Sequence, residues 1–224
     1  MTTASPPADR TFPFFATPQM RTVIDRVAQR VALAPGAVLF RKGEEADSFF
    51  ILDSGEIEIS VTSIDGKKLS LEVLTQSEMF GEIGLFAGRR TADATALSAS
   101  KLRRVRRSDV LAAIRDEPDL AVQMIELLCA RLRSVSEKLE ERAFLPLPTR
   151  LARRFLHLSE KYAERGGTIP MSQADLADFA GATREAVAKA LAVWRARGWI
   201  SMTRGAVHIL DRPALEILAS SDEE

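Results

Sequence analysis

Between residues 55 and 74 apolar and polar residues alternate, and an Asp-Gly pair at 65–66 divides the alternation in two. A period of two places successive side chains on opposite faces of a strand, and Asp-Gly supplies the positive φ angles of a tight hairpin turn. Similar short apolar runs, separated by glycine-containing turns, extend from Pro35 to about residue 107. This part of the chain is therefore predicted to form an antiparallel sandwich or roll.

Helical patterns flank this region on both sides. Thr17-Pro18 is expected to open an amphipathic helix whose apolar face carries Met20, Val23, Ile24, Val27 and Val31. After the strands, Ser108 is expected to cap a short helix that Pro118 interrupts, and a longer helix should run from there to about Leu145.

The longer helix carries an apolar stripe at three- and four-residue spacing. The stripe consists of Met124, Leu128, Leu132, Val135 and Leu139. It could pack on the protein's own sheet or pair with the same helix of a second copy. Because the stripe is narrow, leucine-rich and flanked by charges, we expect a homodimer.

The carboxyl-terminal part has the spacing of a helix-turn-helix. Ala177 is small where two helices approach, Gly181 supplies the positive φ of the turn, and Val187 packs the second helix onto the first. Ser172 and Thr183 are placed to cap the two helices, and Asp175 completes an approximate capping box with Ser172.

A helix over residues 183–197 would then lie in the major groove of DNA. Arg184 has the fork that binds guanine, Glu185 can accept from cytosine N4, and Lys189 reaches a base or a phosphate. A hairpin follows, like a wing, with Arg204 at its tip. The alternative is a solvated helix face with an ion pair between Glu185 and Lys189. The residues expected to contact DNA are Ser172, Thr183, Arg184, Glu185, Lys189 and Arg204.

Composition excludes several other classes of protein. Basic and acidic residues both total 31, so net charge favours no particular partner. The only cysteine, Cys129, rules out an internal disulfide, and His157 and His208 alone provide no metal-ligand spacing. We find no secretory signal and no run of 18 apolar residues, so we expect a cytoplasmic protein without membrane contact. We also expect no metal and no catalytic residues.

Residues 78–96 place an acid, small residues and two adjacent arginines in a stretch whose composition otherwise suggests strand. An arginine beside a glycine-started turn, with the hydroxyl of Thr91, supplies the charged fork, N–H donors and space that a phosphate needs. Glu82 can accept hydrogen bonds from a sugar hydroxyl. A small nucleotide is the ligand that these groups indicate.

The motif "FGEIGLF...RRTA" resembles the phosphate-binding cassette of cyclic-nucleotide-binding domains. Together with the glycines at 43 and 55, the long helix and "TREAVAK", it makes residues 14 to about 210 similar to the CRP/FNR superfamily of bacterial transcription regulators. The resemblance implies an α+β fold with a cyclic-nucleotide-binding β-roll (jelly roll), a dimerisation helix and a winged helix-turn-helix domain. We expect a disordered segment over 1–12, the β-roll sensor over 13–117, the dimerisation helix over 118–145 and the DNA-binding domain over 146–224, with a hinge at Pro146 and Pro148.

The resemblance also implies a cyclic nucleotide, cAMP or cGMP, between the roll and the long helix. The cassette would supply a backbone amide, a carboxylate for the ribose 2′-hydroxyl and a phosphate-binding pair, and the long helix two more side chains, the second from the opposite subunit. In that order these residues are Gly81, Glu82, Arg90 with Thr91, Arg131 and Ser136. The further partners implied are double-stranded DNA, a second copy of the chain and RNA polymerase.

Two departures from the family pattern leave alternatives open. The cassette loop is shorter than usual, so either Arg89 or Arg90 takes the phosphate, and the R-T-A match favours Arg90. Val135 stands where cAMP-binding members have a threonine that reads the adenine amino group. The effector is therefore cAMP, cGMP or no nucleotide at all, and in the last case the roll would be only a dimerisation scaffold. An enzyme would need metal ligands or a histidine beside Glu82 and Arg90, which the cassette lacks.

Overall fold

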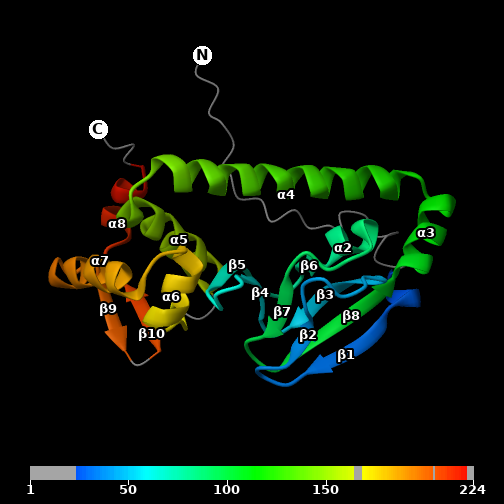
Figure 1. The fold of residues 1–224 in the computed structure, drawn as a ribbon, viewed down its shortest axis with the longest axis horizontal. Coiled ribbons are helices and arrows are strands. Elements are labelled where there is room, and N and C mark those ends of the chain that lie inside the picture. The colour runs from blue at the N-terminus through cyan, green and yellow to red at the C-terminus, as the bar shows by residue number, and fades with distance from the viewer. Residues whose placement is uncertain (1–23, 164–167, 204, 221–224) are drawn as a thin grey trace, which may run out of the picture. The chain divides into compact units, whose positions relative to one another are not determined.

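The computed structural model describes residues 24–163, 168–203 and 205–220, and Figure 1 labels their helices and strands. Strands precede a long helix, and a mainly helical segment follows it, which confirms the α+β fold class. The chain divides into two compact units, Met1–Ile57 with Leu74–Leu132 and Glu58–Val73 with Arg133–Glu224. The hairpin over 58–73 is thus grouped with the carboxyl-terminal helices, and the expected disordered segment 1–12 lies outside the described residues.

Eight short strands form the two sheets of the predicted roll. Their orders are β1-β8-β3-β6 and β2-β7-β4-β5, and the registered pairs are antiparallel. Gly66, in the expected Asp-Gly turn between β4 and β5, has a φ of 76°. The strands are β1 (Gln29–Leu33), β2 (Val38–Phe40), β3 (Ser48–Ser54), β4 (Ile57–Thr62), β5 (Lys68–Leu74), β6 (Met79–Phe80), β7 (Asp93–Ala96) and β8 (Ser100–Arg106).

The cassette contains a helix where the composition suggested a strand. Helix α2 (Glu82–Ala87) begins after Gly81 and ends before Gly88, and both glycines are left-handed, with φ of 84° and 80°. The strand interpretation was wrong because two glycines isolate a six-residue segment, which then closes its own turn: the amide of Leu85 donates to the carbonyl of Gly81.

The expected amino-terminal helix ends earlier than its apolar pattern suggested. Residues 24–27 are helical, and Val31 lies in β1, paired with Leu102 of β8. Placing Val31 on the helix was wrong because its side chain follows the alternation of an edge strand instead. The rest of that helix prediction, Thr17 to Val23, falls on residues that are not described.

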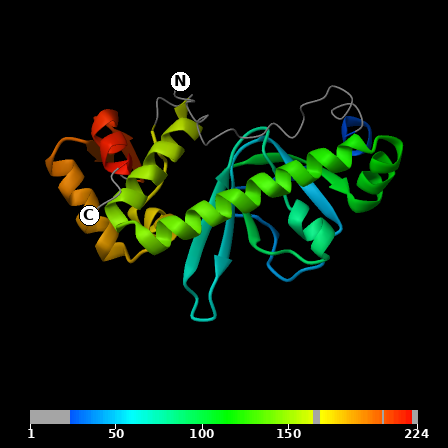
Figure 2. The ribbon, with the colours of Figure 1, turned by 90° about the horizontal axis from the view of Figure 1, so that it is seen from above.

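Two helices follow β8. Helix α3 (Arg107–Asp116) begins one residue before Ser108, so the expected cap is wrong: Arg106 occupies the cap position with extended backbone and no side-chain cap bond. Pro118 does separate α3 from the long helix α4 (Asp119–Phe144), as predicted. Figure 2 shows α4 as one unbroken helix.

The apolar stripe of α4 has two parts. Met124 is only 3% exposed and belongs to the core of the first unit, so this position follows the alternative of packing on the protein's own sheet. Farther along, Leu132, Val135 and Leu139 are 68%, 54% and 63% exposed, and Ile125, which is 59% exposed, continues the stripe with a spacing of seven from Leu132. This outer stripe is left for a partner surface.

The second unit has the elements expected of a winged helix-turn-helix. They are α5 (Leu147–Lys161), α6 (Gln173–Ala180), α7 (Arg184–Ala196), the hairpin β9 (Ile200–Thr203) and β10 (Ala206–Ile209), and α8 (Arg212–Ser220). Trp194 of α7 is 2% exposed and meets Phe155 of α5 edge to face, with ring centroids 5.4 Å apart. Trp194 is therefore a core anchor of this unit.

The β4–β5 hairpin is attached to this unit by a carboxylate and an apolar residue. Glu72 accepts hydrogen bonds from Lys161 at 3.0 Å and Lys138 at 3.0 Å, and its Oε1 lies 3.2 Å from Nε2 of His157. Val73 beside it is fully buried in the same core as the helices. We call Glu72, Lys138, His157 and Lys161 the Glu72 cluster.

Candidate functional site

The cassette turn brings Gly81 and Arg90 into direct contact. The Nη1 group of Arg90 donates to the carbonyl of Gly81 at 3.1 Å, and a β-carbon on Gly81 would lie 2.8 Å from the same nitrogen. Glycine is therefore required here twice, for its positive φ and for the space that the guanidinium fills. Because Gly81 precedes α2, this contact also fixes where the first residue of α2, Glu82, is placed.

Arg90 is held inside the unit, not on its surface. Its side chain is enclosed and the residue is 6% exposed; the guanidinium carbon lies 4.2 Å from the centre of the Phe40 ring and 5.4 Å from that of Phe50. Ser48 of β3 accepts from both ends of the fork, through its carbonyl at 2.7 Å and its hydroxyl at 3.3 Å. Burial lowers the pKa of Arg90 from its usual value, opposed first by the charge of Asp47. A guanidinium nevertheless stays protonated at neutral pH.

Glu82 is the most deeply buried acid of the cassette, at 1% exposure. Its Oε1 lies 2.9 Å from Nε of Arg131 on α4, and Arg131 also donates to the carbonyl of Met79. Burial raises the pKa of Glu82 above its ordinary value, although the charges of Arg131 and Arg90 act in the opposite direction. Sequence reasoning expected Arg131 to face the ligand; here it stands directly beside the carboxylate.

Several polar atoms of this group lack partners. Among the described residues, neither carboxylate oxygen of Glu82 accepts a well-directed hydrogen bond, and Nε of Arg90 is also buried without one. Buried polar atoms without partners are unusual in folded proteins, and each costs roughly 1–3 kcal/mol. An acceptor pair and a cationic donor that interact electrostatically, both left open, fit a ligand that carries hydroxyl groups and a negative charge.

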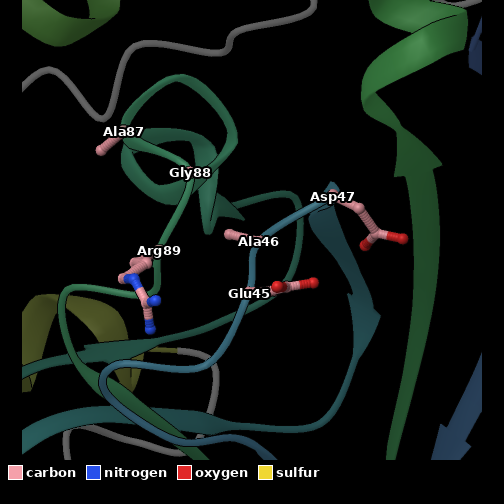
Figure 3. A pocket seen from close by; sticks show the side chains of 6 residues that line it. All are labelled: Glu45, Ala46, Asp47, Ala87, Gly88 and Arg89. Atoms are coloured by element: carbon pink, nitrogen blue, oxygen red, sulfur yellow. The ribbon is translucent and has the colours of Figure 1, made fainter.

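The neighbouring Arg89 and Thr91 are placed differently. Both are exposed, and Arg89 donates to the carbonyl of Gly43 at 2.9 Å. Arg89 also lines an open surface pocket of about 400 Å³, formed by the segment before β3 and the end of α2 (Figure 3). The pocket is lined by Glu45, Ala46, Asp47, Ala87, Gly88 and Arg89, so neither Glu82 nor Arg90 contributes to it. Of the two arginines, Arg90 is the one whose charge acts on the cassette acid.

The remaining sensor candidates lie on α4. Ser136 and Val135 are both exposed, and Val135 belongs to the outer stripe. The role of Ser136 as a contact from an opposite subunit stays a prediction.

The helix-turn-helix is built as its spacing predicted. Ser172 caps α6 by accepting from the amide of Asp175 at 3.2 Å, and Asp175 accepts from the amide of Ser172 at 2.9 Å, a complete capping box. Gly181 ends α6 with a φ of 58°, and Ala177 is 1% exposed where α6 meets α7. Thr183 then caps α7 by accepting from the amide of Ala186 at 3.2 Å.

Helix α7 separates an apolar face from a polar one. Val187, Leu191 and Trp194 are buried in the unit. Thr183, Arg184, Glu185 and Lys189 are exposed. In the described part of the chain no ion pair joins Glu185 to Lys189, so the alternative pairing is not formed and both side chains are accessible. Arg204, the predicted wing tip, lies outside the described residues.

Sequence reasoning missed three residues around Arg90. Phe40, Ser48 and Phe50 come from strands more than 39 positions earlier in the chain, and no spacing rule links them to the cassette. The register of the sheets brings them together, since β3 pairs with β6 immediately before Gly81. A serine directly before the apolar run over residues 49–52 was the only available signal, and it is a weak one.

Two family models match separate stretches of the chain. The cyclic nucleotide-binding domain matches residues 30–117, and the Crp-like helix-turn-helix domain matches residues 149–218. A sensor-type domain followed by a DNA-reading domain defines the class: this chain is a DNA-binding transcription regulator.

Similarity to whole proteins identifies the family of regulators to which the chain belongs. The CRP-like cAMP-activated global transcriptional regulator of Mycobacterium tuberculosis is 31% identical over 204 residues, covering 88% of this chain and 91% of that protein. The Cyclic AMP receptor protein of Thermus thermophilus is 30% identical over 195 residues, covering 85% and 88%. The chain belongs to the CRP/FNR superfamily of transcription regulators, as the cassette and the recognition helix indicated.

Solved structures agree on the fold. The catabolite activator protein of Thermus thermophilus matches with a TM-score of 0.55 and 28% identity, covering 92% of this chain and 98% of that one. FixK2 from Bradyrhizobium japonicum matches with a TM-score of 0.77 and 20% identity, covering 87% and 98%, and supports the fold alone. Regulators of this family bind DNA, function as dimers and are not enzymes, which excludes the catalytic alternative. Within the described ranges no helix is long and apolar enough to cross a membrane.

Proposed function

We propose that this regulator binds a pseudo-palindromic operator as a homodimer and that a cyclic nucleotide in its β-roll controls DNA binding. The observation that carries the ligand half of the proposal is the group of unpartnered atoms on Glu82 and Arg90. A ribose hydroxyl would supply the carboxylate with donors, and a cyclic phosphate would supply the guanidinium with acceptors. The ligand class is therefore an anionic sugar phosphate, with cAMP and cGMP as the candidates.

The dimer half of the proposal rests on the outer stripe of α4. Ile125, Leu132, Val135 and Leu139 are each more than half exposed, although they are apolar and repeat with the heptad spacing of paired helices. A two-fold dimer would place its recognition helices in successive major grooves, with half-sites about 34 Å apart. Because such a protein must reach the chromosome, we place it in the cytoplasm, and RNA polymerase is its expected partner at a promoter.

One observation favours a second candidate, a regulator that needs no nucleotide. Arg131 already neutralises Glu82 at 2.9 Å, so the cassette acid has a charge partner without any ligand. In that case the roll would act as a dimerisation scaffold.

A crossed experiment tests the proposal and separates the two candidates. Calorimetry with cAMP and cGMP would measure nucleotide binding, and fluorescence anisotropy with an operator duplex would measure DNA binding with and without nucleotide. We expect Arg90→Ala to weaken nucleotide binding, and Arg184→Ala to cost about 1–3 kcal/mol of specific DNA binding while leaving nucleotide affinity unchanged. Wild-type protein that binds the operator equally with and without nucleotide, and gives no heat with either one, would favour the scaffold candidate.

A further inference from the structure

The hydrogen-bond inventory of Arg90 defines which edge of its guanidinium is available. A guanidinium has five N–H donors, one on Nε and two on each terminal nitrogen. Nη1 donates to the carbonyls of Ser48 and Gly81, and Nη2 donates to the hydroxyl of Ser48. One hydrogen on Nη2 and the hydrogen on Nε remain.

The two remaining donors lie on the same edge of the fork. The carbonyl and hydroxyl of Ser48 each take a hydrogen from a different terminal nitrogen, so together they occupy the end of the guanidinium. The side edge, formed by Nε and Nη2, is left open, and Nε is buried without a partner among the described residues. A phosphate with two oxygens side by side fits such an edge through two parallel hydrogen bonds.

The hydroxyl of Ser48 is held in place by the ion pair between Asp47 and Arg104. Its hydroxyl donates to Oδ1 of Asp47 at 2.9 Å and accepts from Nε of Arg104 at 3.0 Å. Arg104 in turn donates to both carboxylate oxygens of Asp47, at 2.8 Å and 2.9 Å. The pKa of Asp47 is held below its usual value, chiefly by the hydrogen bond from Arg104. Ser48 is 0% exposed, so no water competes for its hydroxyl. The hydroxyl uses its one donor on Asp47 and its two acceptor positions on Arg104 and Arg90.

We propose that Ser48, held by Asp47 and Arg104, is a positioning residue that turns Arg90 so that its Nε–Nη2 edge faces the ligand phosphate. This inference rests on the proposed cyclic-nucleotide function and adds how the phosphate is recognised. Ser48 touches no ligand atom in this account. Its effect on binding therefore passes entirely through Arg90.

A double-mutant cycle tests this dependence. Calorimetry would give the affinity for cAMP and for cGMP of the wild type, Ser48→Ala, Arg90→Ala and the double variant, under the same salt and pH. We expect Ser48→Ala to weaken binding about three- to tenfold, because the fork loses one of its anchors. The double variant should bind no more weakly than Arg90→Ala alone, and Ser48→Thr, which keeps the hydroxyl, should recover most of the wild-type affinity.

Ser100→Ala is the matched control. Ser100 is a 2% exposed serine of the same unit whose hydroxyl bonds to Glu56 and Ser98 and not to Arg90, so its loss costs hydrogen bonds without changing the fork. If Ser48→Ala does not fold, as judged by circular dichroism, Arg104→Lys removes the support of Ser48 from the neighbouring strand β8, and the affinity lost in that variant should likewise vanish in the Arg90→Ala background. Additive losses, or equal losses for Ser48→Ala and Ser100→Ala, would overturn the positioning role alone. Wild-type protein that binds neither nucleotide would overturn this inference together with the proposed ligand.

Discussion

Glu72 in the second unit and Glu82 in the first are both largely shielded from water, and the two carboxylates are treated in opposite ways. The carboxylate of Glu72 in the second unit is 23% exposed and has Lys138, Lys161 and His157 within 3.2 Å. Glu82 in the first unit is 1% exposed, and among the residues that the structure describes Arg131 is the single cation in ion-pair contact with it. The carboxylate of Glu72 is already paired with side chains of its own unit, whereas the oxygens of Glu82 can still accept hydrogen bonds.

Their protonation follows the same contrast. Burial would raise the pKa of Glu72, but the hydrogen bond with His157 and the charges of Lys161 and Lys138 hold it well below its ordinary value. For Glu82 burial prevails, and its pKa is raised. A depressed pKa marks a charge that stabilises the fold, and a raised one marks a charge that the fold keeps at a cost. The difference suggests how to tell a structural carboxylate from a ligand-binding one: by whether its partners are already present.

The largest expected effect comes from removing the structural carboxylate. Glu72→Ala leaves three basic side chains facing one another, and we expect it to lower the free energy of unfolding of the second unit by about 2 kcal/mol, between the values for exposed and buried pairs. Both tryptophans, Trp194 and Trp199, belong to this unit, so tryptophan fluorescence in urea reports its unfolding specifically.

Glu216→Ala is the control for this prediction. Glu216 pairs with Arg212 four residues away on α8, and both side chains are about half exposed. Such a pair contributes roughly 0.3–0.5 kcal/mol. Equal losses for Glu72→Ala and Glu216→Ala would remove the structural side of the comparison.

The second effect concerns binding and not folding. Glu82→Gln keeps the size of the side chain and removes its charge, so we expect nucleotide affinity to fall about tenfold, as for a lost hydrogen bond to a charged group. Stability should not fall, because burial disfavours the charged carboxylate that the variant removes. Calorimetry measures the affinity, and differential scanning calorimetry the stability. Glu45→Gln, on the surface pocket, should change neither; a Glu82→Gln variant that loses stability instead of affinity would make Glu82 structural.

The sequence was sufficient for the parts of the structure that depend on local patterns. The Ala177–Gly181–Val187 register and the Ser172 cap predicted the helix-turn-helix, because each of these positions is restricted by its own backbone geometry. The strands of the roll followed from alternation and turn residues in the same way. The early helix was overextended to Val31, since apolar residues at i and i+4 also fit an alternating strand.

The candidate site was predictable only in part. The motif identified Glu82 and Arg90, but nothing near them in sequence indicated that Ser48 would hold the fork or that Phe40 would lie under it. Met124 and Ile125 are adjacent apolar residues, and the predicted stripe included Met124. In the structure the packing of the first unit buries Met124 and leaves Ile125 exposed. Sheet register and the choice between neighbouring helix faces are set by contacts distant in sequence, and a single sequence does not display them.

The smallest expected effect is on how stability varies with pH, where the two glutamates should act with opposite signs. The ordinary pKa is 4.5 for both. Because the folded pKa of Glu72 is depressed, its contribution is complete above about pH 4.5 and is lost as the pH falls toward the folded value. Because that of Glu82 is raised, its ionisation weakens the fold above the folded pKa, and this penalty is relieved as the pH falls toward 4.5.

Single glutamine variants should separate the two contributions. Glu72→Gln should lower stability at neutral pH and make the acid loss of the second unit less steep below about pH 4.5. Glu82→Gln should raise the stability of the first unit at neutral pH, with a gain that shrinks on acidification, because the protonated wild-type side chain then resembles glutamine. Urea unfolding followed by tryptophan fluorescence would record the profile of the second unit, and scanning calorimetry would record that of the first. Both would run from about pH 7 to about pH 3. Profiles that shift in the same direction would mean that one electrostatic environment serves both carboxylates, and the distinction between a satisfied charge and a reserved one would fail.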